Sequence, residues 1–315
     1  MVTRKSPRKG SLQFWPRKRA NKFLPRVNWD VVNSVGKSLK GFIGYKVGMV
    51  SLYVKDNTND SMTKGKNIAV PSTILECPGM KIYSVRFYKD NKLVTEVLSE
   101  NFDKELKRAV KLPGKKDGKK IDDVKSQEYN DVKVICYSLV KKIGLKKKPD
   151  LSEIGLKGSL EEKMHFIKEK IGKEISIIDV FGKGELVDLR GLTKGKGLSG
   201  PVRRFGIQLK NQKSEKGRRR PGSLGPWHPA RVIFRVPMAG QLGMFTRVVY
   251  NNKILDLGKS EGKFKNIKNY GDVKTDYIIV KGSVQGPAKR QLLITTPLRE
   301  TKKTKKKNYE LIEIR

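Results

Sequence analysis

Several segments of this chain have the apolar, strand-favouring composition or the alternation of apolar and polar positions that is typical of β-strands. Residues 41–54 are apolar and rich in residues that favour strands, and residues 68–77 resume the same pattern. The polar segment between them, residues 56–67, is rich in Asn, Asp, Ser, Thr and Gly. This arrangement predicts a β-hairpin near the start of the folded core.

The middle of the chain, residues 80–173, mixes two periods. Short alternating runs at 82–88 and 132–140 predict strands, whereas 101–113 has helical spacing up to Pro113. A second helix is predicted to begin at Ser159, where Ser159 and Glu162 have the spacing of a capping box. An apolar stripe of Leu160, Met164, Ile167 and Ile171 supports that helix, and Gly172 ends it.

The strand pattern then returns and continues almost to the end. Residues 174–181, 276–280 and 291–295 are predicted strands, and residues 248–255 read as two strands joined by an Asn-Asn turn. Strands therefore flank the mixed region on both sides, which predicts an insertion into a discontinuous β-domain. The expected organisation is a basic N-terminal extension at 1–40, a β-domain at 41–79 and 174–300, an inserted α+β domain at 80–173, a long basic loop at 204–245, and a basic C-terminal tail at 301–315.

Charge changes this picture more than any other property. The 315 residues include 70 Lys plus Arg and 31 Asp plus Glu, which gives a formal net charge of +39. Such a charge repels itself and attracts polyanions, of which nucleic acid is the usual one. A membrane surface is disfavoured, because no long apolar run exists and the basic stretches are rich in Gly and Pro. The N-terminus also lacks the apolar centre of a secretory signal, so we expect a soluble intracellular protein.

Two stretches hold most of the unbalanced charge. Residues 1–29 contain no acid, and basic residues there alternate with prolines and with Phe14, Trp15 and Phe23. We expect this segment to order on binding, with its aromatic rings stacking on bases or filling an apolar crevice. Between Asp188 and Asp256 the sole acid is Glu215. The lysine-rich turns at 115–120 and 141–148 fit solvated loops and phosphate-facing loops equally well.

Enzymatic and metal-binding motifs fail on their context. Residues 195–200 satisfy G-x-G-x-x-G, yet Pro201 and two arginines follow, and no helical apolar period or suitably placed acid comes after them. Gly36-Lys37-Ser38 resembles the end of a phosphate-binding loop whose opening glycine is replaced by Val31. Two cysteines, Cys77 and Cys136, and two histidines give neither a disulfide framework nor a metal or catalytic constellation. We therefore expect no enzyme activity, no cofactor and no small-molecule substrate.

One set of spaced residues resembles a known family. Phe181, Asp188, Gly191, Thr193, Gly195-Lys196-Gly197, Gly200 and Arg204 follow the signature spacing of the large-subunit ribosomal protein family three. The N-terminal RKSPRKGSLQFWPRKRA and the later GSLGPWHPARV are similar to the archaeal and eukaryotic branch of that family. The resemblance spans essentially the whole chain.

The resemblance implies a mainly β fold, a translation-factor-like β-barrel that is discontinuous in sequence, with an inserted α+β domain and long basic extensions. It implies a structural role in the cytoplasmic ribosome, with large-subunit rRNA and neighbouring ribosomal proteins as partners, no membrane, and a part in early assembly. The long loop would carry Trp227 and His228 at a tip near the peptidyl transferase centre. The residues expected to bind rRNA are Trp15, Arg17, Lys18, Arg19, Lys194, Gly195, Lys196, Gly197, Arg203, Arg204, Arg218, Arg219, Arg220, Trp227, His228, Arg231 and Arg235.

Alternatives remain for both the protein and its tryptophan. A DNA-architectural protein would share the charge but should carry a groove-reading helix, and an RNA-modifying enzyme should carry a catalytic group. Trp227 could fill a core pocket instead of standing at a loop tip, and residues 1–29 could be a generic solubilising tail.

Overall fold

A computed structural model describes residues 7–32, 36, 38–113, 121, 124 and 129–315. The chain divides into two compact units. We call residues 24–191 with 248–315 the sheet unit, and residues 1–23 with 192–247 the basic unit. The lysine-rich turn expected at 115–120 lies outside the described residues.

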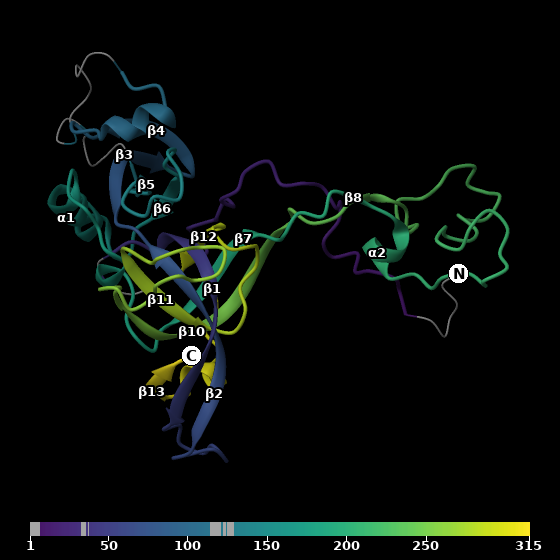
Figure 1. The fold of residues 1–315 in the computed structure, drawn as a ribbon. Helices are drawn as coiled ribbons and strands as arrows, with labels where there is room; N and C mark the ends of the chain where they lie inside the picture. The colour runs from purple at the N-terminus through teal and green to yellow at the C-terminus, as the bar shows by residue number, and fades with distance from the viewer. Residues whose placement is uncertain (1–6, 33–35, 37, 114–120, 122–123, 125–128) are drawn as a thin grey trace. The chain divides into compact units, whose positions relative to one another are not determined.

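The sheet unit is organised around a seven-stranded sheet (Figure 1). Its strand order is β12-β7-β10-β11-β2-β1-β13, and β1 also pairs with β12, so the order returns to its first strand. Pairing brings buried residues opposite one another, as with Phe42 and Ile294 or Ile74 and Ile279. The prediction of a mainly β protein is confirmed. The strands are β1 Gly41–Asp56, β2 Asn67–Cys77, β7 Leu186–Leu192, β10 Thr246–Lys259, β11 Asp276–Lys281, β12 Gln291–Thr295 and β13 Tyr309–Ile314.

The predicted hairpin is confirmed as β1 and β2, which pair antiparallel over most of their length. Asp56 ends β1, and its carboxylate organises the loop that follows. It accepts hydrogen bonds from the Thr58 backbone N–H at 2.9 Å, the Ser61 hydroxyl at 2.8 Å and the Thr63 hydroxyl at 2.6 Å. These bonds favour the charged form and hold the pKa of Asp56 well below its usual range. The polar residues of this loop therefore hold the loop together by hydrogen bonding to Asp56.

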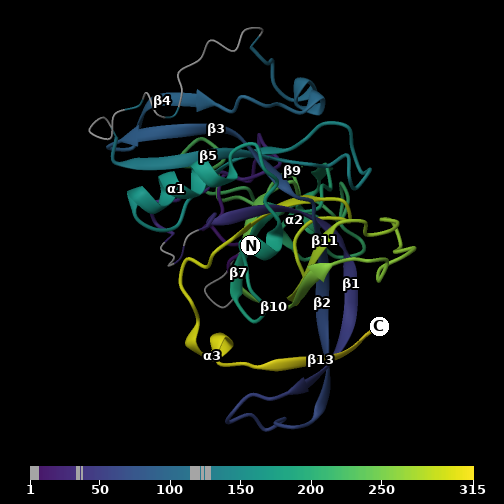
Figure 2. The ribbon, with the colours of Figure 1, turned by 90° about the vertical axis from the view of Figure 1, so that its left-hand side faces the viewer.

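A second, four-stranded sheet lies within residues 80–155, in the order β4-β3-β5-β6. The helix predicted from Ser159 is confirmed as α1, Leu160–Lys170, and Figure 2 shows it alongside β5. Both bonds of the capping box are present, the Glu162 N–H donating to Ser159 Oγ at 3.4 Å and the Ser159 N–H to Glu162 Oε2 at 3.0 Å. One continuous apolar core joins this region to the seven-stranded sheet. The strands are β3 Met80–Lys89, β4 Lys92–Leu98, β5 Asp131–Ser138 and β6 Leu151–Gly155.

Three predicted elements are wrong. The helix expected at 101–113 is a short 3-10 helix, Lys104–Arg108, with Leu106 as its one buried residue. The strand expected at 174–181 is a single bridge at Ile175 followed by a 3-10 helix, Ile177–Asp179, because Ser176 and Asp179 cap each other's backbone. The segment expected as a basic C-terminal tail contains α3, Lys302–Lys305, and then strand β13 on the edge of β1.

A fourth error concerns Asn251 and Asn252, which do not form a turn between two strands. Strand β10 runs through them without a break, and Asn251 has φ of 55°. The buried Asp188 carboxylate accepts the Asn251 N–H at 2.8 Å through Oδ1 and the Leu298 N–H at 2.9 Å through Oδ2. The tolerance of asparagine for positive φ is thus used inside a strand and not in a turn. Asp188 ties β7 to β10 and to the segment after β12.

Glu76 is a second buried carboxylate with a structural role. Its Oε1 accepts hydrogen bonds from the Lys274 N–H at 2.7 Å, the Thr275 N–H at 2.9 Å and the Thr275 hydroxyl at 3.1 Å. The Tyr270 hydroxyl donates to Oε2. The side chain belongs to β2 and is 0% exposed. It therefore holds the segment before β11 by satisfying donors that would otherwise be buried without partners.

We predict that Glu76→Ala lowers the free energy of unfolding by about 2 kcal/mol or more, because two backbone N–H groups lose their acceptor. Urea unfolding followed by circular dichroism measures this. Glu100→Ala, at an exposed position, is the control and should change stability by less than about 0.5 kcal/mol. Equal midpoints for the two variants would contradict this role of Glu76.

Candidate nucleic-acid interface

A narrow stem begins the basic unit where the chain leaves β7 and where it returns to β10. The Thr193 N–H donates to the Phe245 carbonyl at 3.0 Å, and the Lys196 N–H donates to the Leu242 carbonyl at 2.9 Å. Farther out, β8, Leu198–Ser199, pairs with β9, Gly240–Gln241. The outgoing and returning chains therefore support each other through backbone bonds.

Gly243 shows how closely the two chains of the stem approach. It has φ of 78°, and a Cβ at this position would lie 2.0 Å from the Lys194 carbonyl oxygen. Any other residue would separate the chains or distort them. Glycine at this position is therefore required by the close approach of two backbone segments within the protein, whether or not a ligand binds there.

A short helix, α2, Pro201–Phe205, follows the stem. The sequence reasoning did not foresee it, because five residues are too few to show an apolar period. Proline at the first helical position and Gly206 at the C-cap, with φ of 64°, explain its limits. Arg204 points from this helix to the returning chain, donating to the Gln241 carbonyl and the Met238 carbonyl, both at 3.0 Å. Arg204 therefore braces the base of the long loop.

The N-terminal segment packs on α2 through its aromatic residues. The Trp15 ring stacks on Phe205 with centroids 5.9 Å apart and meets Phe234 edge-on at 5.7 Å. Arg17 lies over Phe205 at 4.3 Å and donates to the Arg204 carbonyl at 2.8 Å. Trp15, which the sequence predicted to bind rRNA, thus packs on two phenylalanine rings of the basic unit and stays partly exposed.

Arginines gather around these rings. Arg247 lies over Phe14 at 4.3 Å, and Arg8 donates to the Arg235 carbonyl. Burial lowers the pKa of the Arg17 guanidinium, and three nearby arginines lower it further: Arg204, Arg247 and Arg8. Like charges so close together favour any anion that settles among them. Carbonyls and ring faces orient the guanidinium groups of Arg17 and Arg204 without supplying a negative charge.

The other predicted site residues are spread over the surface of the basic unit. Residues 206–239 contain no helix or strand. Within them, Arg218 donates to the Lys210 carbonyl at 3.3 Å. The exposed members of the predicted set are Lys18, Arg19, Lys194, Gly195, Lys196, Gly197, Arg203, Arg218, Arg219, Arg220, Trp227, His228, Arg231 and Arg235.

The exposure of Trp227 distinguishes a side chain at a loop tip from one that fills a core pocket. Its side chain is 89% exposed, which contradicts a role as a core plug. Trp29, by contrast, is 3% exposed and its indole N–H donates to the Glu153 carbonyl at 3.0 Å. A tryptophan held almost fully in solvent keeps both ring faces available for stacking.

The basic unit has almost no internal counter-charge, since its one carboxylate is the exposed Glu215. Across the described ranges, no group of three or more His, Cys, Asp or Glu is placed to hold a metal ion. Nor does any helix in the described part of the chain have the length and apolar character needed to cross a membrane. What the arrangement can do is bind anions.

Sequence reasoning missed the partners that orient the predicted residues. Phe205, Phe234 and Phe245 were not singled out, although each lies within a basic run. The available signal was the recurrence of aromatic residues among arginines in both stretches, which allows ring faces and guanidinium groups to pack together.

The fold and this surface define a mainly β protein with a strongly basic extension. The profile of the family described as ribosomal protein L3 matches residues 1–315. The large ribosomal subunit protein uL3 of Methanocaldococcus jannaschii is 40% identical over 308 residues, covering 93% of this chain and 91% of its own length. The uL3 protein of Archaeoglobus fulgidus is 38% identical over 310 residues, covering 94% and 93%.

The chain therefore belongs to the ribosomal protein L3 family, as its spaced signature predicted. It is a structural ribosomal protein and not an enzyme. Its place is the cytoplasm, as part of the ribosome.

We predict that Trp15→Ala makes the Arg17–Arg19 region about two- to tenfold more sensitive to trypsin, because an aromatic pair contributes roughly 0.5 to 1.5 kcal/mol beyond its buried area. The rate of cleavage in the full chain is followed by mass spectrometry. Leu12→Ala, at a 39% exposed position, is the control and should leave that rate unchanged. Equal rates in the two variants would mean that the stacking does not hold the segment.

Proposed function

We propose that this protein binds large-subunit rRNA through its basic unit and supports early assembly of the subunit. The observation that carries the proposal is the accumulation of arginine and lysine in a unit with one exposed carboxylate. Uncompensated charge of this density is costly in a free protein, and a polyphosphate backbone neutralises it. Membership of a ribosomal family supports rRNA as that polyanion. Neighbouring ribosomal proteins are further partners in this proposal.

The residue types of the unit suit an irregular RNA surface. Glycine allows the backbone to approach phosphates closely, lysine supplies a mobile point charge, and arginine supplies a planar fork that binds phosphate with two bonds. The stem and Arg204 supply a fixed base, and residues 206–239 supply a long segment without secondary structure. We infer that this segment adopts its final path against RNA.

We further propose that Trp227 is the tip of that segment and stacks on a base near the peptidyl transferase centre. An aromatic ring that stacks on a nucleobase contributes about 1 to 3 kcal/mol. The 89% exposure of the ring and the surrounding prolines, Pro226 and Pro229, support this reading. Proline limits the unbound conformations of the segment and so lowers the cost of ordering it. Arg231 and Arg235 follow Trp227 and would contact phosphates beside it.

For the sheet unit we propose a closed barrel of β12, β7, β10, β11, β2 and β1. The return of the strand order through the β1–β12 pairing supports closure, because a closed ladder leaves no free edge. Residues 80–173 are then an inserted α+β domain with a sheet of its own, between barrel segments at 41–79 and 174–300. Residues 1–40, 204–245 and 301–315 are the extension, loop and C-terminal segment that this barrel carries.

We predict that affinity for a large-subunit rRNA transcript falls steeply with salt, with a slope of log K against log salt of about −0.7 to −0.9 for each neutralised phosphate. Filter binding at several salt concentrations measures it. The variant with Arg218, Arg219 and Arg220 all changed to Gln should show a shallower slope. Binding that barely changes between low and moderate salt would contradict the electrostatic account.

We predict that Trp227→Ala leaves the thermal midpoint of the isolated protein unchanged but impairs assembly or activity of subunits that contain it, because the ring is exposed in the free chain. Thermal unfolding and sedimentation of reconstituted subunits measure the two effects. Trp29→Ala is the contrasting variant and should lower the midpoint. If Trp227→Ala unfolded the isolated protein, the proposal that Trp227 acts only in contact with RNA would be wrong.

A further inference from the structure

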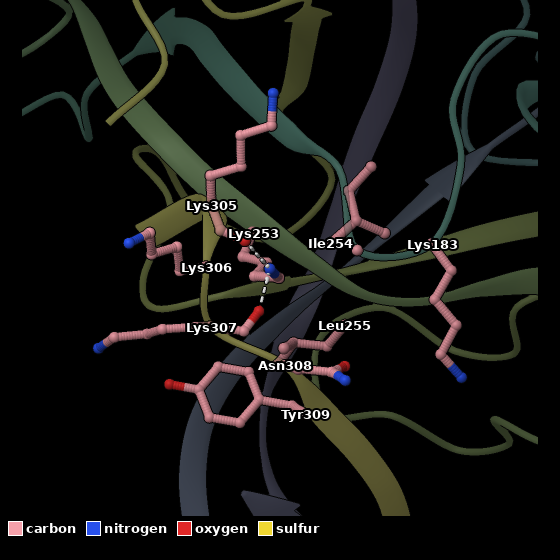
Figure 3. A pocket seen from close by; sticks show the side chains of 10 residues that line it. Lys183, Lys253, Ile254, Leu255, Lys305, Lys306, Lys307, Asn308 and Tyr309 are labelled. Carbon is pink, nitrogen blue, oxygen red and sulfur yellow. Dashed lines mark hydrogen bonds between the residues drawn. The ribbon is translucent and has the colours of Figure 1, made fainter. Parts of the chain in front are cut away.

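A hollow of about 320 Å³ in the sheet unit is lined by five lysines (Figure 3). It lies between the start of β7, the middle of β10 and the segment joining α3 to β13. Its lining is Lys183, Gly184, Lys253, Ile254, Leu255, Lys305, Lys306, Lys307, Asn308 and Tyr309. None of the five lysines belongs to the basic unit or to the residues that the sequence predicted to bind rRNA.

Carboxylates pair with two of the five lysines that line the hollow. Lys183 pairs with Asp256 at 3.3 Å, and Lys305 pairs with Glu300. For Lys253, Lys306 and Lys307 the structure gives no ion pair within the residues it describes. The hollow is therefore a concentration of positive charge for which the protein supplies only part of the counter-charge.

Lys253 fixes the shape of the hollow. Its side chain is 6% exposed, and its ammonium group donates to the Lys305 carbonyl at 3.0 Å and to the Lys307 carbonyl, as the dashed lines in Figure 3 show. Burial lowers the pKa of the Lys253 ammonium, and the charge of Lys281 lowers it further. A buried cation that two carbonyls orient but no carboxylate neutralises is stabilised by an anion placed beside it.

The side chains of the other lysines extend in different directions. In Figure 3 the side chains of Lys306 and Lys307 extend to one side, and that of Lys183 extends to the other. Lys306 is exposed and Lys307 partly exposed. Lysine carries a compact charge on four rotatable carbons, so ammonium groups on opposite rims can turn toward one guest. Lys281 adds a further cation nearby, donating to the Tyr309 hydroxyl at 2.8 Å.

We propose that this hollow is a second anion-binding site, which takes a phosphate group of the RNA backbone. The inference rests on the proposed rRNA binding and adds to it an RNA-binding surface on the sheet unit, outside the basic unit. A phosphate group fits because its charge meets the three unpaired lysines while its oxygens accept from several ammonium groups at once. Lys306 and Lys307 bind its oxygens, and the buried Lys253 adds its charge and positions their segment through the Lys305 and Lys307 carbonyls.

Lysine footprinting tests the site directly. The full chain is treated with an amine-acetylating reagent alone, with a large-subunit rRNA transcript, and with inorganic phosphate, and modified lysines are identified by mass spectrometry. We expect RNA to protect Lys306 and Lys307 and to leave Lys302 and Lys303 reactive, because the latter pair is exposed in the same segment but does not line the hollow.

Paired variants give a second readout. K306Q/K307Q should make the slope of log K against log salt shallower by roughly 0.7 to 0.9 for each phosphate that the variant no longer neutralises. K302Q/K303Q removes the same charge from the same segment and should leave the slope unchanged. Both pairs change partly or fully exposed side chains, so thermal midpoints should match that of the unchanged chain.

The outcomes separate this inference from the function on which it rests. Protection of Lys194 and Lys196 without protection of Lys306 and Lys307 would overturn the hollow as a site and leave rRNA binding intact. No protection of either set would overturn both. Protection of Lys306 and Lys307 by inorganic phosphate but not by the rRNA transcript would overturn the RNA backbone as the ligand and identify the hollow as a site for a free phosphate ion. If K306Q/K307Q and K302Q/K303Q changed the salt slope equally, the hollow would contribute only through its general positive charge, and the proposed site would be wrong.

Discussion

Positive charge without internal counter-charge is the constraint on which this protein depends. The basic unit has one carboxylate, so its arginines are held by groups that orient them without neutralising them. Arg204 donates to two carbonyls, and Arg17 lies over Phe205. These interactions fix positions while leaving the charge to be met from outside. In the proposed complex, the phosphates of rRNA supply that counter-charge.

The sheet unit differs in that it contains all but one of the acidic residues of the chain, and it uses some of them to hold its shape. Its buried carboxylates bind backbone N–H groups of segments that are distant in the sequence. Asp188 ties Asn251 and Leu298, and Glu76 ties Lys274 and Thr275. The chain leaves this unit after β7 and returns at β10, so the long loop is anchored at both ends. The two units differ in this way because every acidic residue except Glu215 lies in the sheet unit.

Local patterns predicted local structure well. The β1–β2 hairpin follows from its polar loop, and α1 follows from Ser159 and Glu162. Errors arose where long-range interactions override local signals. An Asn-Asn pair is typical of a turn, but the Asp188 carboxylate holds Asn251 inside β10. The last segment looks like a basic tail, and pairing with β1 makes it a strand.

The site shows the same limit. Exposed lysines and arginines could be named from charge alone, whereas the packing of Trp15 on Phe205, a residue far along the chain, could not. The hollow around Lys253 was equally invisible, because its lysines come from separate elements. Charge patterning therefore predicts which segments bind a polyanion, and the structure shows which groups orient their side chains.

Ultraviolet crosslinking of assembled large subunits, followed by mass spectrometry of RNA-linked peptides, tests the central claim most directly. Neutralisation of the basic unit by rRNA predicts that linked peptides from this protein concentrate in residues 7–23 and 192–247 and include Trp227. Linked peptides confined to the sheet unit, with none from residues 192–247, would contradict it.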